Sequence, residues 1–285
     1  MILNECFKLT NGLNIPKLGL GTWFIDDDKA AEVVREAVKI GYHHFDTAQA
    51  YGNERGVGEG VRTASVPREE LFVTTKLAAE IKDYDGAVKA IDESLAKAGL
   101  EYYDLLLIHA AQPWDDFRGG DYAEENREAW KAIIDAYNSG KLKAIGVANF
   151  TIEDIENLTS TGLMKPMVNQ LLVHIGNTPQ ELIDYCQKND ILVEGYSPVA
   201  HGEILKHEGI KAMADKYGVS VAQLCIRYDL QLGTLPLPKT ANPEHMKENA
   251  AVDFEISEED MEALKNIEHI KDYGEFTLFP VFSGK

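Results

Sequence analysis

Four residues whose types suit proton transfer occur in order between positions 46 and 109. Asp46 and Tyr51 are five residues apart, and Lys76 and His109 each end a short apolar run farther along the chain. A tyrosine phenol has a pKa near 10 and is a weak acid at neutral pH, but a neighbouring ammonium favours the phenolate and lowers that pKa. We therefore expect Lys76 to activate Tyr51, Asp46 to pair with Lys76, and a neutral His109 to donate a hydrogen bond to a substrate oxygen.

This set suits the protonation of a carbonyl oxygen as negative charge develops on it. Protonation is half of a carbonyl reduction, and the other half is a hydride that no side chain supplies, so a cofactor must bring it. Each residue alone has a plainer explanation, since Asp46 and Lys76 would form a structural ion pair and His109 would be a core histidine. The residues taken together favour catalysis.

Apolar runs that alternate with amphipathic segments indicate how these side chains are positioned. Strands are predicted at residues 43–47, 71–76, 104–109, 143–149, 167–172 and 191–197, with weaker ones at 234–238, which prolines interrupt, and at 250–254. Most of these runs are continuous, as in parallel strands buried on both faces. Eight strands alternating with helices predict a (β/α)8 TIM barrel formed by residues 1–285 as a single domain, with a doubly wound sheet as the alternative.

Helix signals and one turn signal complete this pattern. Val33, Val34, Ala37 and Val38 recur at helical spacing. Helix starts are expected at Thr151 with Asp154, Thr178 with Pro179 and Glu181, Ser220 with Gln223, Asn242 with Pro243, and Ser257 with Asp260. Asn11-Gly12 predicts a β-hairpin over residues 6–15 that closes the bottom of the barrel.

Polar residues stand at or near the ends of nearly all the predicted strands, where barrel enzymes carry their chemistry. They are Asp46, Lys76, His109, Asn149, Asn169, Gln170, Tyr196 and Lys239. With the stretches GLGTW at 19–23, FDTAQAYGNE at 45–54, VTTK at 73–76, LLIH at 106–109, GVANF at 146–150, GYSP at 195–198 and LPKT at 237–240, they occur in an order that resembles the aldo-keto reductase family. The resemblance runs from the first hairpin to near Asp260 and is closest to the bacterial branch of 2,5-diketo-D-gluconate and glyoxal reductases.

The resemblance implies a (β/α)8 barrel whose catalytic tetrad is Asp46, Tyr51, Lys76 and His109, with Tyr51 as the general acid. It also implies a nicotinamide cofactor that binds without a Rossmann fold. In agreement, no G-x-G-x-x-G motif lies between a strand and a helix, and the glycines at 56–60 have the wrong spacing.

Cofactor positions carry over from the family residue by residue. Asn149 and Gln170 match the carboxamide ligands, and Tyr196, followed by Ser197, matches the ring that stacks on nicotinamide. The other matched positions are Thr22 and Asp46 at the ribose, Gly202 and Leu205 over the pyrophosphate, Lys239, Thr240 and His245 at the 2′-phosphate, and Glu248 and Asn249 near the adenine.

Three positions depart from the family pattern. Ala148 replaces a serine and loses a carboxamide contact. His245 replaces an arginine, which weakens recognition of the 2′-phosphate, so NADP(H) is expected to be preferred while NAD(H) remains usable. Ala110 replaces a tryptophan that walls the substrate pocket, which predicts a wider and more polar mouth. The expected walls are Trp23, Phe24, Tyr51, His109, Ala110 and Trp114, although Trp114 is also explained as an ordinary surface-loop residue.

Composition excludes several classes of partner. The net charge of −19 repels nucleic acid and anionic membranes, so we expect neither as a partner. The first ten residues lack the features of a signal peptide, and Cys6, Cys186 and Cys225 fit scattered reduced thiols, which together predict a cytoplasmic protein. No His/Cys spacing suggests a metal site, and His43-His44 is better explained by one ring inside the barrel and one outside. We expect a monomer or weak dimer that binds a small carbonyl substrate.

Two other functions compete with carbonyl reduction. A non-catalytic, nucleotide-binding regulatory barrel is disfavoured because the tetrad is intact. A Schiff-base aldolase or lyase that uses Lys76 is permitted by a lysine at a strand end. It leaves the adenosine-phosphate motif at residues 238–249 unexplained.

Overall fold

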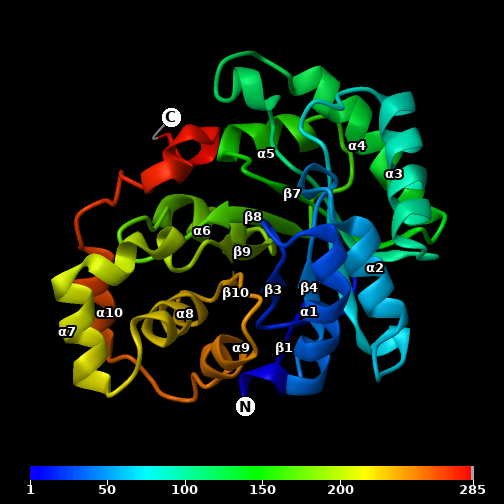
Figure 1. Ribbon diagram of the computed structural model, residues 1–285. Coiled ribbons are helices and arrows are strands. Elements are labelled where there is room, and N and C mark those ends of the chain that lie inside the picture. Colours follow the sequence, from blue (N-terminus) through cyan, green and yellow to red (C-terminus); the bar gives the residue numbers. More distant parts are fainter. Residues whose placement is uncertain (284–285) are drawn as a thin grey trace.

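A ring of eight parallel strands forms the centre of the computed structural model, which describes residues 1–283 (Figure 1). The strands are β3 (Leu20–Gly21), β4 (His44–Asp46), β5 (Phe72–Leu77), β6 (Tyr103–Ile108), β7 (Leu142–Ala148), β8 (Val168–Leu172), β9 (Leu192–Tyr196) and β10 (Leu235–Leu237). Each strand pairs with its neighbour in chain order. The ring closes where the Gly21 amide donates to the Pro238 carbonyl over 3.1 Å. The predicted (β/α)8 barrel is confirmed.

Helices separate or follow these strands and cover the outside of the ring (Figure 1). They are α1 (Asp27–Ile40), α2 (Glu54–Arg62), α3 (Tyr84–Ala98), α4 (Ala123–Asn138), α5 (Ile152–Thr159), α6 (Gln180–Lys188), α7 (Glu208–Tyr217), α8 (Val221–Gln231), α9 (Pro243–Ala250) and α10 (Glu258–Lys265). The apolar face predicted for α1 is buried, including Val33, Val34, Ala37 and Val38. Burial of one face against the strands therefore stabilises this helix.

Most of the predicted helix starts are confirmed. Reciprocal capping boxes begin α5 at Thr151 and α8 at Ser220, and Asn242 caps α9. Ser257 caps α10. The capping box at Thr178 was wrong, because its hydroxyl pairs with Tyr228 Oη at 2.7 Å instead of capping α6.

One predicted strand was wrong and one real strand was missed. Ala250 ends α9, and residues 251–254 alternate in burial, but no strand pairs with them. Side chains of α8 take their place, since Gln223 donates to the Ala251 carbonyl and Gln231 to the Ile256 carbonyl, both over 2.8 Å. The first barrel strand is instead the two-residue β3, so Asp46 ends the second strand of the ring.

The predicted hairpin lies at the amino-terminal end of the barrel. β1 (Cys6–Lys8) pairs with the antiparallel β2 (Asn14–Pro16). Gly12 has φ +89°, which a turn of this kind requires and which glycine adopts without strain. Asn11 Nδ2 donates to the Lys143 carbonyl at the start of β7 over 2.8 Å, so the hairpin closes the bottom as expected.

Several features bear on function elsewhere in the chain. None of the helices within residues 1–283 is both long and apolar enough to cross a membrane. The three cysteines are free, with Cys186 and Cys225 buried. His44 lies inside the barrel against Thr74, whereas His43 contacts the Glu70 carbonyl outside it. Within the same residues, no group of three or more His, Cys, Asp or Glu side chains is placed to hold a metal ion.

Candidate active site

Lys76 is the centre of the predicted catalytic group. Its ammonium donates to Asp46 Oδ1 over 2.6 Å, to the Thr47 carbonyl over 3.1 Å and to Tyr51 Oη over 3.2 Å. The side chains of Lys76 and Asp46 are almost completely buried. Residues 74 and 76 of β5 face the same side of the strand, and Thr74 contacts His44 inside the barrel. Lys76 therefore points into the barrel as well. The expected pairing of Asp46 with Lys76 is present.

A short 3₁₀ turn, Gln49–Tyr51, presents the phenol to Lys76. Asn53, which the sequence did not single out, holds this turn to the neighbouring loop. Its Oδ1 accepts from Thr47 Oγ1 over 2.7 Å, and its Nδ2 donates to the carbonyls of Thr22 and Ile25. Because Asn53 is buried, these hydrogen bonds satisfy its whole amide and fix the position of Tyr51.

The pKa of Tyr51 differs from expectation. Burial raises this pKa above its usual value, the charge of Asp46 adds to the rise, and the ammonium of Lys76 opposes it without reversing it. The predicted net lowering was therefore wrong, because the desolvation of a buried phenol outweighs one adjacent cation. Burial acts on Lys76 in the opposite sense, but Asp46 and Tyr51 raise the pKa of Lys76 above its ordinary value and keep it charged.

His109 lies beside the phenol, with 5.8 Å between its ring centroid and that of Tyr51. Burial, assisted by the charge of Lys76, lowers the pKa of His109 well below its ordinary value, so the ring is neutral. Nδ1 is buried and has no hydrogen-bond partner among the described residues. A neutral ring here can donate one hydrogen bond to an oxygen in the cavity, as the sequence predicted.

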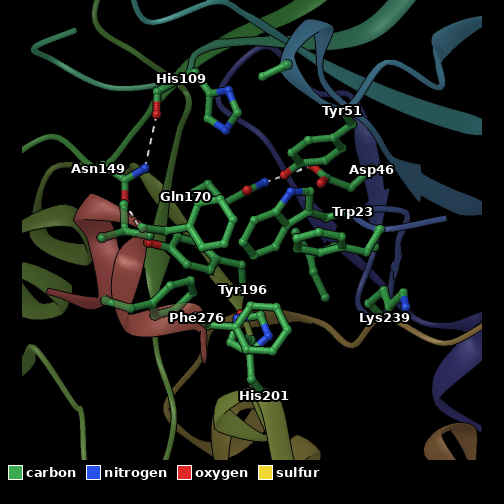
Figure 2. A pocket seen from close by; sticks show the side chains of 18 of the residues that line it. Trp23, Asp46, Tyr51, His109, Asn149, Gln170, Tyr196, His201, Lys239 and Phe276 are labelled. Carbon is green, nitrogen blue, oxygen red and sulfur yellow. Dashed lines mark hydrogen bonds between the residues drawn. The ribbon is translucent and has the colours of Figure 1, made fainter. Parts of the chain in front are cut away.

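Asn149, Gln170 and Tyr196 line the same cavity, which has a volume of about 560 Å³ (Figure 2). Asn149 joins two site residues, since its Nδ2 donates to the His109 carbonyl over 3.0 Å and its Oδ1 accepts from Tyr196 Oη over 2.8 Å. Gln170 Nε2 donates to Asp46 Oδ2 over 2.9 Å. Asn169, on the opposite face of β8, bonds to the Phe150 carbonyl and does not join the site.

Most of the residues expected around the rest of the cofactor follow β9 and β10. Lys239 and Ser197 line the cavity, whereas Thr22, which follows β3, is buried outside its lining and donates to the Asp46 carbonyl. Gly202 lies in the turn Ala200–Lys206 with φ +91°, and Leu205 is 45% exposed there. The last group comprises Thr240, which accepts from the Asn242 amide, the exposed His245 and Glu248 of α9, and the buried Asn249.

The prediction that Ala110 forms part of the cavity wall is wrong. Ala110 is fully buried with Ala79 and Phe117 and does not line the cavity. Trp114 lines it instead, with 5.0 Å between its ring centroid and that of His109. The loop thus supplies an aromatic wall from a position four residues later than Ala110. Trp23 and Phe24 line the cavity as expected.

The C-terminal tail supplies walls that the sequence reasoning missed. Phe276 and Phe282 line the cavity from two 3₁₀ turns, Gly274–Leu278 and Pro280–Phe282, and Phe279 lines it from between them. His201 stacks on Phe276 with 4.0 Å between ring centroids (Figure 2). The only available signal was the density of aromatic residues at 276–282, which lies beyond the matched motifs.

Comparisons with known proteins agree with this geometry. Residues 17–269 match the Aldo/keto reductase family. The chain is 39% identical to the glyoxal reductase of Bacillus subtilis over 92% of each chain, and 36% identical to the methylglyoxal reductase of Escherichia coli O157:H7 over 94% of each. Among solved structures, an aldo/keto reductase from Brucella melitensis superposes with a TM-score of 0.87 at 36% identity, over 94% of this chain and 99% of that one. A Bombyx mori aldo-keto reductase in complex with NADP superposes with a TM-score of 0.84 at 33% identity, over 96% and 95% of the chains.

Proposed function

The chain belongs to the aldo/keto reductase family, and from that premise we propose that it is an NADPH-dependent reductase of small aldehydes, ketones or dicarbonyls in which Tyr51 supplies the proton. The observation that carries the proposal is the contact of Lys76 with both Tyr51 and Asp46 inside a cavity of suitable size. The relatives that reduce glyoxal and methylglyoxal support the substrate class.

The residues at the cavity fit a nicotinamide cofactor. Gln170 and Asn149 would hold the carboxamide, Tyr196 offers an aromatic ring to the nicotinamide, and Lys239 lies at the rim for the 2′-phosphate. When bound, the reduced nicotinamide supplies the hydride. The segment at Ala200–Lys206 would cover the pyrophosphate.

The four catalytic residues have distinct roles in this proposal. Tyr51 Oη donates its proton to the carbonyl oxygen, and the Lys76 ammonium stabilises the phenolate that remains. Asp46 keeps Lys76 charged and in place. Neutral His109 donates a hydrogen bond that orients the carbonyl. The high pKa of Tyr51 keeps the phenol protonated until the substrate oxygen gains charge.

The competing functions gain no support from the geometry. A Schiff-base mechanism needs a neutral lysine amine. Lys76 instead donates to three oxygens and has a raised pKa. A purely regulatory barrel gives no reason for a phenol, an ammonium and a neutral imidazole to converge on one cavity.

We also propose that NADPH is preferred and NADH usable, because Lys239 and Thr240 remain while His245 stands in place of an arginine. A cytoplasmic location, the single-domain organisation and the monomeric or weakly dimeric state stay predictions.

The test is a purified-protein assay with NADPH and methylglyoxal, in which the absorbance of the reduced nicotinamide is followed. We expect NADPH oxidation that depends on the carbonyl compound and is nearly abolished in Tyr51→Phe. Tight NADPH binding without turnover of glyoxal, methylglyoxal or simple aldehydes would favour the regulatory barrel instead.

A further inference from the structure

Glu194 is a buried acid beneath the site that the proposed mechanism does not use. It is fully buried on β9, two residues before Tyr196, so both side chains face the barrel interior in successive layers. On the neighbouring β8, its register partner is Gln170. Glu194 therefore lies directly beside a residue assigned to the cofactor carboxamide.

The contacts of Gln170 show what this acid does. Gln170 Nε2 donates to Glu194 Oε2 over 2.8 Å and to Asp46 Oδ2 over 2.9 Å (Figure 2 shows the bond to Asp46). An amide nitrogen carries two protons, so these two acids take both. The amide oxygen is then directed away from the acids, and Gln170 itself lines the cavity.

The charge state of Glu194 is compatible with its place beside Asp46 and Lys76. Burial, together with the charge of Asp46, raises the pKa of Glu194 to about 8. The other titratable group that faces it is His44, whose Nε2 lies 3.8 Å from Glu194 Oε1. Burial lowers the pKa of His44 to about 3, so this ring is neutral too. At neutral pH, Glu194 thus offers an acceptor oxygen without a second negative charge beside Asp46.

We propose that Glu194 is a positioning residue for nicotinamide recognition. Its carboxyl group holds the Gln170 amide with the nitrogen toward the barrel interior and the oxygen free to accept a hydrogen bond from the cofactor carboxamide. Asp46 alone would satisfy only one of the two amide protons, so the amide would be held by a single hydrogen bond and its orientation less firmly fixed. The inference rests on the proposed function, since that function assigns Gln170 to the carboxamide.

The experiment compares two ligands that share only the adenosine end. Dissociation constants for NADPH and for 2′,5′-ADP, which has no nicotinamide, are measured by tryptophan fluorescence in the wild type, Glu194→Leu and Glu194→Gln. We expect Glu194→Leu to weaken NADPH binding by about fivefold to tenfold, the scale of one hydrogen bond, and to leave 2′,5′-ADP binding within about twofold. Glu194→Gln keeps an acceptor oxygen and should retain most of the NADPH affinity.

Two controls separate positioning from general damage. Asp229→Asn also removes a fully buried acid, but one without hydrogen-bonded site residues, and it should not change the ratio of the two dissociation constants. In a Gln170→Leu background, adding Glu194→Leu should change NADPH binding by less than about twofold, because the residue through which Glu194 acts is already gone. Where Glu194→Leu does not fold, as judged by its melting curve, Glu194→Met replaces it.

The outcomes are distinguishable. Equal weakening of both ligands, unchanged NADPH binding, or a Glu194→Gln variant as impaired as Glu194→Leu would each overturn the positioning role. A wild-type protein that binds NADPH no more tightly than 2′,5′-ADP would overturn the proposed function first, and this inference with it.

Discussion

The ring of Phe282 makes an edge-to-face contact with the ring of Tyr196, with 6.3 Å between centroids and an angle of 83°. Phe282 is 1% exposed and also packs against Trp23 and His201. We expect a nicotinamide that stacks on Tyr196 to compete with this contact. We therefore predict that Phe282→Ala binds NADPH about twofold to tenfold more tightly, because a smaller fraction of the protein then has its Tyr196 ring covered by the tail.

Titration of NADPH against tryptophan fluorescence measures this change. Phe279→Ala is the matched control, because Phe279 packs on Trp23 and Phe24 rather than on Tyr196. Weaker NADPH binding by Phe282→Ala would mean that the tail clamps the cofactor instead of competing with it.

Tyr51→Phe tests the proton donor. We expect turnover to fall by roughly 100-fold or more, the scale of general acid catalysis, while NADPH binding survives. Steady-state rates and a binding titration on the same preparation check both parts. Near-normal turnover would mean that a group other than Tyr51 supplies the proton.

Trp114→Ala tests the identity of the pocket wall. Because Trp114 packs on His109 and lines the cavity, its removal should raise kcat/KM for a bulky aryl ketone relative to methylglyoxal by about tenfold. Ala110→Trp should instead destabilise the fold by about 1–3 kcal/mol, since Ala110 is fully buried in a small cluster behind the Trp114 wall and has no room for a larger side chain. An unchanged substrate ratio in Trp114→Ala would place the pocket elsewhere.

Long apolar runs made most of the barrel strands predictable, whereas the elements with the shortest or least distinct patterns were not. β3 has only two residues, and Leu20-Gly21 has too little pattern to identify a strand. The strand predicted at residues 250–254 failed for the opposite reason. Its pattern resembles a strand, but Ala250 ends α9, and α8 side chains donate to the Ala251 and Ile256 carbonyls, which a sequence does not reveal.

The residues of the site also differ in whether the sequence could predict them. Asp46, Tyr51, Lys76 and His109 were predictable because each follows a recognisable strand or motif. Glu194 was not, because a glutamate within an apolar run gives no sign of its partner on the next strand. Ala110 misled because a loop can replace a missing ring from another position, here Trp114.

Asp229 gives a prediction about stability. Both carboxyl oxygens are buried without a hydrogen-bond partner in residues 1–283, and burial raises the pKa of Asp229 well above its ordinary value. An acid with a raised folded pKa binds more protons in the native state, so stability is lost as pH rises above the ordinary value of about 3.9. We expect Asp229→Asn to be more stable by roughly 1–3 kcal/mol at pH 8, with the advantage shrinking toward pH 4. Melting temperatures across this range provide the check, and a gain that grows as pH falls would contradict the assignment.

We expect His245 to set how strongly the protein distinguishes NADPH from NADH. It is exposed on α9, which follows Lys239 and Thr240, and the family resemblance implies an arginine at its position. An arginine is permanently charged and binds phosphate through two donors, whereas an imidazole lacks this planar pair of donors. The acidic surface also disfavours the extra charge of NADPH, but salt screens that distant effect.

We therefore expect the ratio of kcat/KM for NADPH over NADH to be lower in the wild type than in His245→Arg. The substitution should raise this ratio by about 5- to 30-fold, which corresponds to about 1–2 kcal/mol. His269→Arg, which makes the same change at an exposed position of the tail, is the matched control and should leave the ratio unaltered. An unchanged ratio in His245→Arg would mean that His245 does not face the 2′-phosphate. Discrimination would then rest on Lys239 and Thr240 alone, because they are the other residues matched to that group.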